Sequence, residues 1–360
     1  MNVPCAQFTT LKIGGPARFF HRAETEDDVL RGLDFARERD VPVFILGGGS
    51  NILIADGGFD GLVLQIAIKG IAVSAPGALA TGSSVAFKNP VATAPGSDSS
   101  DTAFVTAQAG EDWDKFVENC VANDLAGVEC LSGIPGFVGG TPVQNVGAYG
   151  QEVSETIVSV RCLDRQTSTI VTLANADCGF SYRTSIFNSS ARDRYIVLSV
   201  TFALVKGGRP KIVYKDLIEQ FGERQPSLAE VRKSVLRIRR SKSMVIDADD
   251  PNSRSAGSFF KNPVVSRAQL AELKTKYERL PFFEFGESVK IPAAWLIERA
   301  GFEKGFALGN AGISTNHTLA IVNRGGASAV EVLSLKNEIQ RAVEDKFGIL
   351  LQPEPVFIGF

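Results

Sequence analysis

Two glycine-dense segments constrain the fold of this chain more than any other feature of its sequence. The first, LGGGSNIL, occupies residues 46–53 directly after a strand-like apolar run, and the second, SGIPGFVGGTPVQNVGAYG, occupies residues 132–150. Glycine lets the main chain turn its N–H groups toward a phosphate without obstruction by a side chain. The first segment matches neither the GxGxxG pattern nor the Walker lysine motif, so it indicates neither a Rossmann fold nor a P-loop.

Together, the two segments predict one long anionic ligand, such as a dinucleotide, that the backbone approaches from two sides. In the first segment, Ser50 and Asn51 add side-chain donors to the glycine N–H groups. In the second, some residues would place backbone against the ligand and others would pack on an apolar ring: Gly136, Gly139, Gly140, Asn145 and Gly147 for the backbone, and Ile134, Pro135 and Val138 for the ring. Taken alone, each segment is also consistent with a tight turn or a glycine-bent core strand.

The hydrophobic pattern predicts helices and strands in two or three domains, as the length of 360 residues allows. Apolar residues recur at helical spacing after Thr25, Asp112 and Ser227. Further helices are expected near residues 271–277, 293–301 and 329–347, and strands within 41–66, at 156–163, 168–173 and 194–205, and in the extended segment 349–360. The middle strands favour an antiparallel or mixed sheet. Residues 75–102 are rich in Gly, Ala, Ser and Pro, as a surface insert would be.

The composition favours a small-molecule partner over nucleic acid or a membrane. Lysine and arginine total 38 against 40 acidic residues, so no overall basic field exists. The sequence has no signal-peptide pattern and no apolar run near the roughly 18 residues of a membrane span, so we expect a cytoplasmic protein. Five scattered cysteines and two histidines favour neither a disulfide framework, a metal site nor a Ser/His/Asp triad.

Five motifs, in this order and spacing, resemble the bacterial UDP-N-acetylenolpyruvoylglucosamine reductases (UDP-N-acetylmuramate dehydrogenases) of peptidoglycan precursor synthesis. They are GGGSN, IPGFVGGTPVQNVGAYG, YRTSIF, AGSFFKNPV and QPEPVFIG. The resemblance spans nearly the whole chain. The pentapeptide FKNPV also occurs at residues 87–91, but without the Gly-Ser that precedes the aromatic pair of the second copy, so we interpret the first copy as coincidence.

The resemblance implies an α+β fold of the vanillyl-alcohol-oxidase type, with two FAD-binding domains and a third, substrate-binding domain. The boundaries would be 1–70, 71–222 including the insert 75–102, and 223–347, with residues 348–360 packing back near the active site. FAD would be held noncovalently by the two glycine segments. The implied FAD contacts are Gly47, Gly48, Gly49, Ser50, Asn51, Ile134, Gly136, Gly140, Asn145 and Gly147.

The implied reaction is the reduction of an enolpyruvyl ether to a lactyl ether. NADPH reduces FAD and leaves, and the flavin hydride then adds to the terminal vinyl carbon of the substrate. The resemblance assigns proton donation to Ser258, and stabilisation of the enol to Arg183 and Glu354. Gly257 permits a close backbone approach at this serine, and the two phenylalanines that follow it would exclude water.

For the uridine diphosphate part of the substrate, the resemblance implies a further set of contacts. These are Tyr214, Lys242 and Asn262, with Tyr182 as an additional candidate. Tyr214 marks the subclass with a closing tyrosine loop. Ala307 stands where some members have a polar residue, which leaves one substrate contact open. The expected protein is a monomer that uses a UDP-sugar and NADPH; a sugar or alcohol oxidase on the same fold and an inactive nucleotide-binding module remain alternatives.

Overall fold

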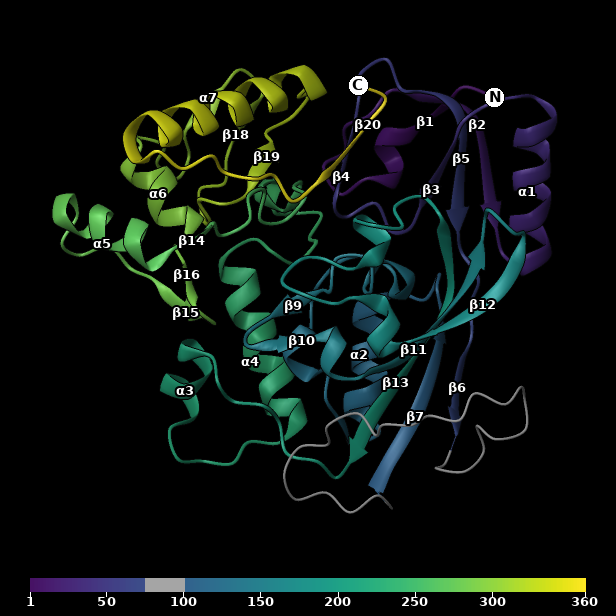
Figure 1. Cartoon of the computed structure of the whole chain (residues 1–360), viewed down its shortest axis with the longest axis horizontal. Helices are drawn as coiled ribbons and strands as arrows, with labels where there is room; N and C mark the ends of the chain where they lie inside the picture. The colour runs from purple at the N-terminus through teal and green to yellow at the C-terminus, as the bar shows by residue number, and fades with distance from the viewer. Residues whose placement is uncertain (75–100) are drawn as a thin grey trace. The chain divides into compact units, whose positions relative to one another are not determined.

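The computed structural model describes residues 1–74 and 101–360, which fold as two units (Figure 1). The C-terminal unit comprises Met1–Phe19, Gly49–Gly61 and Ser241–Phe360, and the central unit comprises Phe20–Gly48 and the described part of Leu62–Arg240. The chain therefore leaves the central unit inside the first glycine segment. The three-domain division expected from the sequence is a different partition and stays a prediction. Most of the expected insert, with the first FKNPV copy, lies outside the described residues.

An antiparallel sheet forms the middle of the central unit. In order across the sheet, its strands are β12 (Thr169–Ala174), β11 (Ile157–Asp164), β13 (Tyr195–Lys206), β7 (Thr102–Gln108) and β6 (Ile71–Ser74), and β8 (Leu125–Ala126) also pairs with β13. Ser199 of β13 lies opposite Arg161 on one side and Gln108 on the other. Like β11 and β7, β13 has neighbours on both sides, which its apolar sequence suits. The strands expected over residues 156–163, 168–173 and 194–205 are confirmed.

Two helices of the central unit have the caps that their sequences indicate. In α1 (Glu26–Glu38), Thr25 and Asp28 form a capping box. In α2 (Trp113–Ala122), the Asp112 carboxylate accepts a hydrogen bond from the Lys115 N–H at 3.0 Å. The apolar face of α2 packs on the sheet, where the rings of Phe116 and Phe202 are 4.9 Å apart. In the same unit, β3 (Val43–Leu46) pairs in parallel with residues 62–65 of β5 (Phe59–Ile66).

The C-terminal unit packs three helices against small antiparallel sheets. The helices are α5 (Arg267–Lys276), α6 (Ala293–Arg299) and α7 (Ala329–Phe347), and the sheets are β14 (Val264–Val265) with β16 (Ser288–Lys290) and β15 (Phe283–Phe285), and β17 (Ala307–Leu308) with β18 (Ala311–Ile313) and β19 (Ile321–Asn323). The helix α7, yellow in Figure 1, buries Val332, Leu335, Ile339 and Val343 at helical spacing. Its bounds are those expected from the sequence. None of the helices in the described ranges is both long and apolar enough to span a membrane.

In the C-terminal unit, the end of the chain pairs with a strand at the end of the first glycine segment. The last strand, β20 (Val356–Ile358), pairs in parallel with β4 (Ile52–Ile54), and Phe357 lies opposite Leu53. Near the N-terminus, β1 (Val3–Pro4) pairs with the first residues of β2 (Pro16–Ala23). Because β4 directly follows the first glycine segment, the pairing places the QPEPVFIG motif beside that segment.

Candidate active site

Gly49 of the first glycine segment is required by local packing. Its φ is +65°, in the left-handed region that side chains disfavour. A Cβ atom at this position would lie 1.8 Å from the carbonyl oxygen of Phe8. The backbone N–H of Thr10 donates to the carbonyl oxygen of Gly49 at 3.1 Å, which holds the segment against the N-terminal residues. Gly49 therefore fixes the shape of the segment within the C-terminal unit.

Within the central unit, the two glycine segments touch through their backbones. A Cβ atom on Gly48 would lie 2.7 Å from the Cα atom of Gly136, so only glycine permits this approach. Gly47 and Gly140 differ, since no heavy atom of the described residues lies within 4 Å of the position a Cβ atom would take. The segments thus combine close backbone contact with open faces. This arrangement fits an extended dinucleotide lying along them, as the sequence predicts for FAD.

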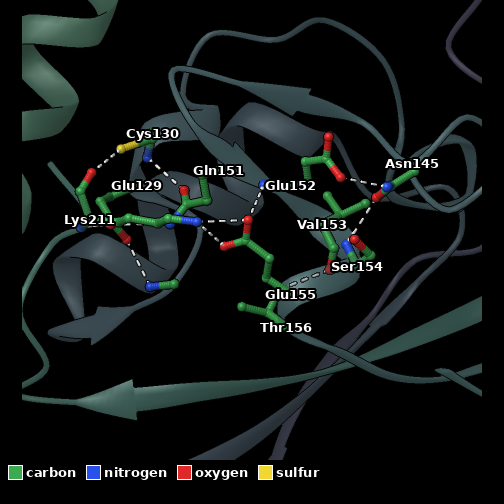
Figure 2. A network of polar contacts seen from close by, with 11 residues as sticks. Glu129, Cys130, Asn145, Gln151, Glu152, Val153, Ser154, Glu155, Thr156 and Lys211 are labelled. Atoms are coloured by element: carbon green, nitrogen blue, oxygen red, sulfur yellow. Dashed lines mark hydrogen bonds and ion pairs between the residues drawn. The ribbon is translucent and has the colours of Figure 1, made fainter. Parts of the chain in front are cut away.

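Asn145 is buried inside the second glycine segment. It is 1% exposed and has a φ of +45°. Its Nδ2 donates to Oε2 of Glu152 at 2.8 Å, and its Oδ1 accepts from the N–H of Ser154 at 3.1 Å (Figure 2). Its Nδ2 also donates to the carbonyl oxygen of Ser181 at 3.1 Å. The side chain of Asn145 therefore forms hydrogen bonds with other residues of the protein. The contact to FAD expected of Asn145 stays a prediction.

A polar network around the buried Glu129 lies beside this segment (Figure 2). Glu129 is 1% exposed, and its carboxylate accepts from the N–H of Gly127 at 2.7 Å and from the N–H of Lys211 at 3.0 Å. It also accepts from Nε2 of Gln151 at 3.2 Å, and Oε1 of that glutamine accepts from the N–H of Cys130 at 2.9 Å. Because its acceptors are occupied, the buried charge is tolerated. The network fixes β10 (Gln151–Glu152), which pairs with β9 (Gly147–Ala148).

Arg183 lies against the same segment. Its φ is +55°, and its Nη2 donates to the carbonyl oxygen of Gly147 at 2.8 Å. The amide of Asn188 donates to the backbone oxygen of Arg183 at 3.2 Å, and the guanidinium carbon lies 5.4 Å from the centroid of the Tyr182 ring. A Cβ atom on Gly147 would lie 3.2 Å from Nη1 of Arg183. The central unit thus brings together three predicted residues, Gly147, Tyr182 and Arg183.

The charge pair of Asp114 and Arg232 was not predicted from the sequence. Oδ1 of Asp114 accepts from the N–H of Gly133 at 2.6 Å, at the start of the second glycine segment. Both carboxylate oxygens also bind Arg232, at 2.5 and 3.0 Å. Burial acts to raise the pKa of Asp114, but the hydrogen bonds from Arg232 and Gly133 outweigh it and lower that pKa below its usual value. In the sequence, Asp114 looks like an ordinary charged residue of a helix. Only the fold brings it next to Arg232, 118 positions away.

Tyr214 precedes α3 (Lys215–Phe221) and is 37% exposed. Its ring meets that of Tyr149 edge to face, with centroids 5.1 Å apart. Burial raises the pKa of Tyr149 to about 12, so its phenol is neutral at pH 7. Tyr149 is the next-to-last residue of the second glycine segment and was not among the predicted site residues. The aromatic pair connects the predicted tyrosine loop to that segment within the central unit.

In the C-terminal unit, backbone hydrogen bonds bring the Ser258 and Glu354 segments together. The N–H of Glu354 donates to the carbonyl oxygen of Phe259 at 2.9 Å, and Phe260 pairs with Pro353 in an antiparallel bridge. Phe259 and Phe260 are 0% and 2% exposed, whereas Ser258 and Glu354 are half-buried. Two predicted catalytic residues from motifs 96 positions apart therefore lie on adjoining backbone. The expected meeting of both with Arg183 stays a prediction.

Three other positions of the C-terminal unit were singled out from the sequence. Oδ1 of Asn262 accepts from the N–H of Ala293 at 2.9 Å and so caps α6. Lys242 is half-buried directly after α4 (Leu228–Ser241), and Ala307 is exposed in β17. Within the described ranges, no three His, Cys, Asp or Glu side chains form a group that could hold a metal ion.

Comparisons with known proteins agree with these features. An FAD binding domain model matches residues 17–174, and the C-terminal domain model of UDP-N-acetylenolpyruvoylglucosamine reductase matches residues 249–358. The expected α+β FAD-binding fold and the FAD cofactor are confirmed. A crystal structure of UDP-N-acetylenolpyruvylglucosamine reductase from Thermus caldophilus, 24% identical, has a TM-score of 0.61 and covers 99% of this chain and 97% of that one. That likeness supports the fold.

Full-length relatives give the family. The UDP-N-acetylenolpyruvoylglucosamine reductase of Thermobifida fusca is 44% identical, and the alignment covers 99% of this chain and 97% of the relative. The protein of the same name from Salinispora arenicola is 42% identical, with 98% and 94% covered. With such identity along nearly its whole length, the chain belongs to the family of UDP-N-acetylenolpyruvoylglucosamine reductases.

Proposed function

We propose that this protein uses NADPH to reduce UDP-N-acetyl-3-O-(1-carboxyvinyl)-glucosamine to UDP-N-acetylmuramate in peptidoglycan precursor synthesis. The observation that carries the proposal is the pairing of the Ser258 and Glu354 segments through the hydrogen bond from the Glu354 N–H to the Phe259 carbonyl oxygen. The relatives are named as reductases, which favours this function over the oxidase considered from the sequence. We place the reaction in the cytoplasm, and a monomeric state stays a prediction.

The two glycine segments are the residues that would hold FAD. Gly47 and Gly140 offer open backbone, and Gly48, Gly136 and Gly49 set the course of the two segments. When bound, FAD supplies hydride transfer from NADPH to the vinyl carbon of the substrate. The neighbouring Ser50, Asn51, Ile134 and Gly147 complete the proposed contacts, which are noncovalent.

Ser258, Arg183 and Glu354 would handle the charge and the proton. Once the terminal vinyl carbon has gained a hydride, the π electrons of the double bond move toward the carboxylate and leave an enediolate-like carbanion. The guanidinium of Arg183 stays positive at any physiological pH and stabilises that charge. Glu354, held extended between Pro353 and Pro355, orients the enol. The hydroxyl of Ser258 then gives its proton to the carbon beside the carboxylate, which completes the lactyl ether.

The nucleotide part of the substrate would be bound by a tyrosine loop and a lysine. Tyr214, half-exposed and in edge contact with Tyr149, offers a face and a hydroxyl to the ligand. The ammonium group of Lys242 suits a diphosphate as a mobile point charge. Asn262 contributes its amide nitrogen, since its oxygen caps α6. Tyr182, beside Arg183, is a further contact.

Anaerobic stopped-flow spectroscopy tests the proposal by following the two half-reactions separately. NADPH should bleach the flavin absorbance of the purified protein, and the enolpyruvyl UDP-sugar should restore it with one product formed per flavin. In Ser258→Ala, bleaching by NADPH should proceed as in the wild type, while reoxidation by the sugar should be nearly abolished. A wild-type flavin that the enolpyruvyl sugar cannot reoxidise would sink the proposed function. Equal losses in both half-reactions of Ser258→Ala would remove Ser258 as the proton donor.

A further inference from the structure

Thr10 joins two segments of the C-terminal unit that the sequence does not connect. The residue is 8% exposed, and its Oγ1 donates to the carbonyl oxygen of Ser255 at 2.6 Å. Its backbone N–H donates to the carbonyl oxygen of Gly49 at 3.1 Å. The same Oγ1 also lies 3.4 Å from the carbonyl oxygen of Ser50, a longer contact within the first glycine segment. Thr10 thus holds that segment mainly by its backbone, and the segment that leads to Ser258 by the short bond from its side chain. The side-chain bond spans 245 positions of sequence.

Further hydrogen bonds close these segments into a ring. Nδ2 of Asn51 donates to the carbonyl oxygen of Glu354 at 3.2 Å. The carbonyl oxygen of Asn51 accepts from the N–H of Val356 at 3.0 Å. The N–H of Glu354 in turn donates to the carbonyl oxygen of Phe259 at 2.9 Å. The glycine segment therefore reaches Ser258 along two routes, one through Thr10 and one through the QPEPVFIG motif.

The bond from Thr10 acts on the turn that presents Ser258. Ser255 is 6% exposed, and its Oγ accepts from the N–H of Gly257 at 3.2 Å. Gly257 has a φ of +75°, so the chain turns sharply directly before Ser258. A buried carbonyl that loses its donor is costly, and the turn would shift to find another partner. The side chain of Thr10 thereby governs where the turn places the hydroxyl of Ser258.

We propose that Thr10 is a positioning residue for proton transfer, acting on Ser258 through the turn of residues 255–257. The inference rests on the proposed function and on the proton-donor role of Ser258. Thr10 itself does not contact the reacting atoms. The backbone bond to Gly49 does not depend on the side chain, and the contact of the hydroxyl with Ser50 is longer than its bond to Ser255. Changes in the hydroxyl should therefore affect the Ser258 side of the ring more than the glycine segment.

The experiment compares Thr10→Val with Thr10→Ser in the FAD-loaded protein. Valine keeps the volume but removes the hydroxyl, whereas serine keeps the donor. In Thr10→Val, reoxidation of the reduced flavin by the enolpyruvyl UDP-sugar should slow by about 10- to 100-fold, since a displacement near 1 Å can cost about 10²-fold. Its solvent deuterium isotope effect should rise, because proton transfer becomes limiting. In Thr10→Val, flavin reduction by NADPH should stay within about twofold of the wild-type rate. In Thr10→Ser, reoxidation should proceed at about the wild-type rate.

Thr9 supplies a matched control. Its Oγ1 also donates to a carbonyl, that of Ile13 at 3.0 Å, and it is 2% exposed, but this bond stays within the N-terminal segment. Thr9→Val should lower the melting temperature as Thr10→Val does, without changing the ratio of the two half-reaction rates. Thr10→Cys, whose thiol is a weaker donor, should give an intermediate rate of reoxidation and provides a milder variant that tests the same bond.

Three results would overturn the inference. Thr10→Val could reoxidise at the wild-type rate, or it could slow both half-reactions alike in the manner of a structural residue. Adding Thr10→Val to Ser258→Ala could also slow reoxidation as much as it does alone, which would show that Thr10 does not act through Ser258. Failure of the proposed function itself has a different signature, since the wild-type flavin would then not respond to the enolpyruvyl sugar at all.

Discussion

Alanine substitutions at Gly49 and Gly47 should have opposite effects on folding and on FAD binding. At Gly49 the left-handed conformation alone costs an alanine about 1–2 kcal/mol. Its Cβ atom would lie 1.8 Å from the Phe8 carbonyl oxygen, so one of the two backbones must move. That movement breaks the hydrogen bond from Thr10, which contributes about 0.5–1.5 kcal/mol. The total loss in the free energy of unfolding is therefore about 1.5–3.5 kcal/mol.

Gly47 has no such constraint. Its φ is not positive, and no heavy atom of the residues that the structure describes lies within 4 Å of the position that a Cβ atom would take. Alanine there should leave the stability of the FAD-free protein unchanged or raise it by about 0.4–1 kcal/mol, through the lower entropy of the unfolded chain. If FAD lies along the open backbone, the added methyl group should weaken FAD binding by tenfold or more, which corresponds to about 1.4 kcal/mol.

Two measurements on FAD-free protein separate these effects. Thermal unfolding should show a midpoint lowered by about 3–14 °C for Gly49→Ala and unchanged or slightly raised for Gly47→Ala, given roughly 2–4 °C per kcal/mol. Titration with FAD, followed by quenching of flavin fluorescence, should show the weaker binding of Gly47→Ala. A wild-type melting temperature in Gly49→Ala would refute the steric reasoning. Wild-type FAD affinity in Gly47→Ala would remove this glycine from the cofactor site.

Two further predictions concern polar groups whose roles the fold assigns. Asn262→Ala removes the cap on α6 and should lower the free energy of unfolding by about 1 kcal/mol, whereas Asn262→Asp keeps an acceptor for the Ala293 N–H and should retain stability while raising the KM for the UDP-sugar. Asp114→Asn should cost about 2–3 kcal/mol at pH 7, because Arg232 loses its two short bonds to a carboxylate and keeps only the longer contact with Glu118 at 3.6 Å. Since the pKa of Asp114 is lowered on folding, the wild type holds this contribution above about pH 4 and loses it as the pH falls through the folded value. Urea unfolding at pH 7 and pH 3 should therefore show the difference between wild type and variant shrinking in acid; a constant difference would contradict the assignment.

Local chemistry explains why much of the secondary structure could be predicted from the sequence. The cap at Thr25 and the apolar spacing of residues 329–347 act within one or a few turns of chain, and both helices begin at the expected residues. The apolar runs of the central sheet are likewise strands. The roles of individual glycines could not be predicted in this way. Gly47 and Gly49 are near neighbours in one motif, yet one faces open space and the other meets the Phe8 carbonyl oxygen.

The sequence by itself determined the family, the cofactor and the helices and strands, because motif order and hydrophobic periodicity are properties of the chain alone. Only the tertiary structure decided which polar groups form hydrogen bonds with one another. The amide of Asn145 is used inside the protein, Asp114 anchors the second glycine segment, and Thr10 reaches the turn before Ser258. The last of these contacts joins residues 245 positions apart, and a hydrogen bond requires a separation near 3 Å that no spacing along the chain specifies.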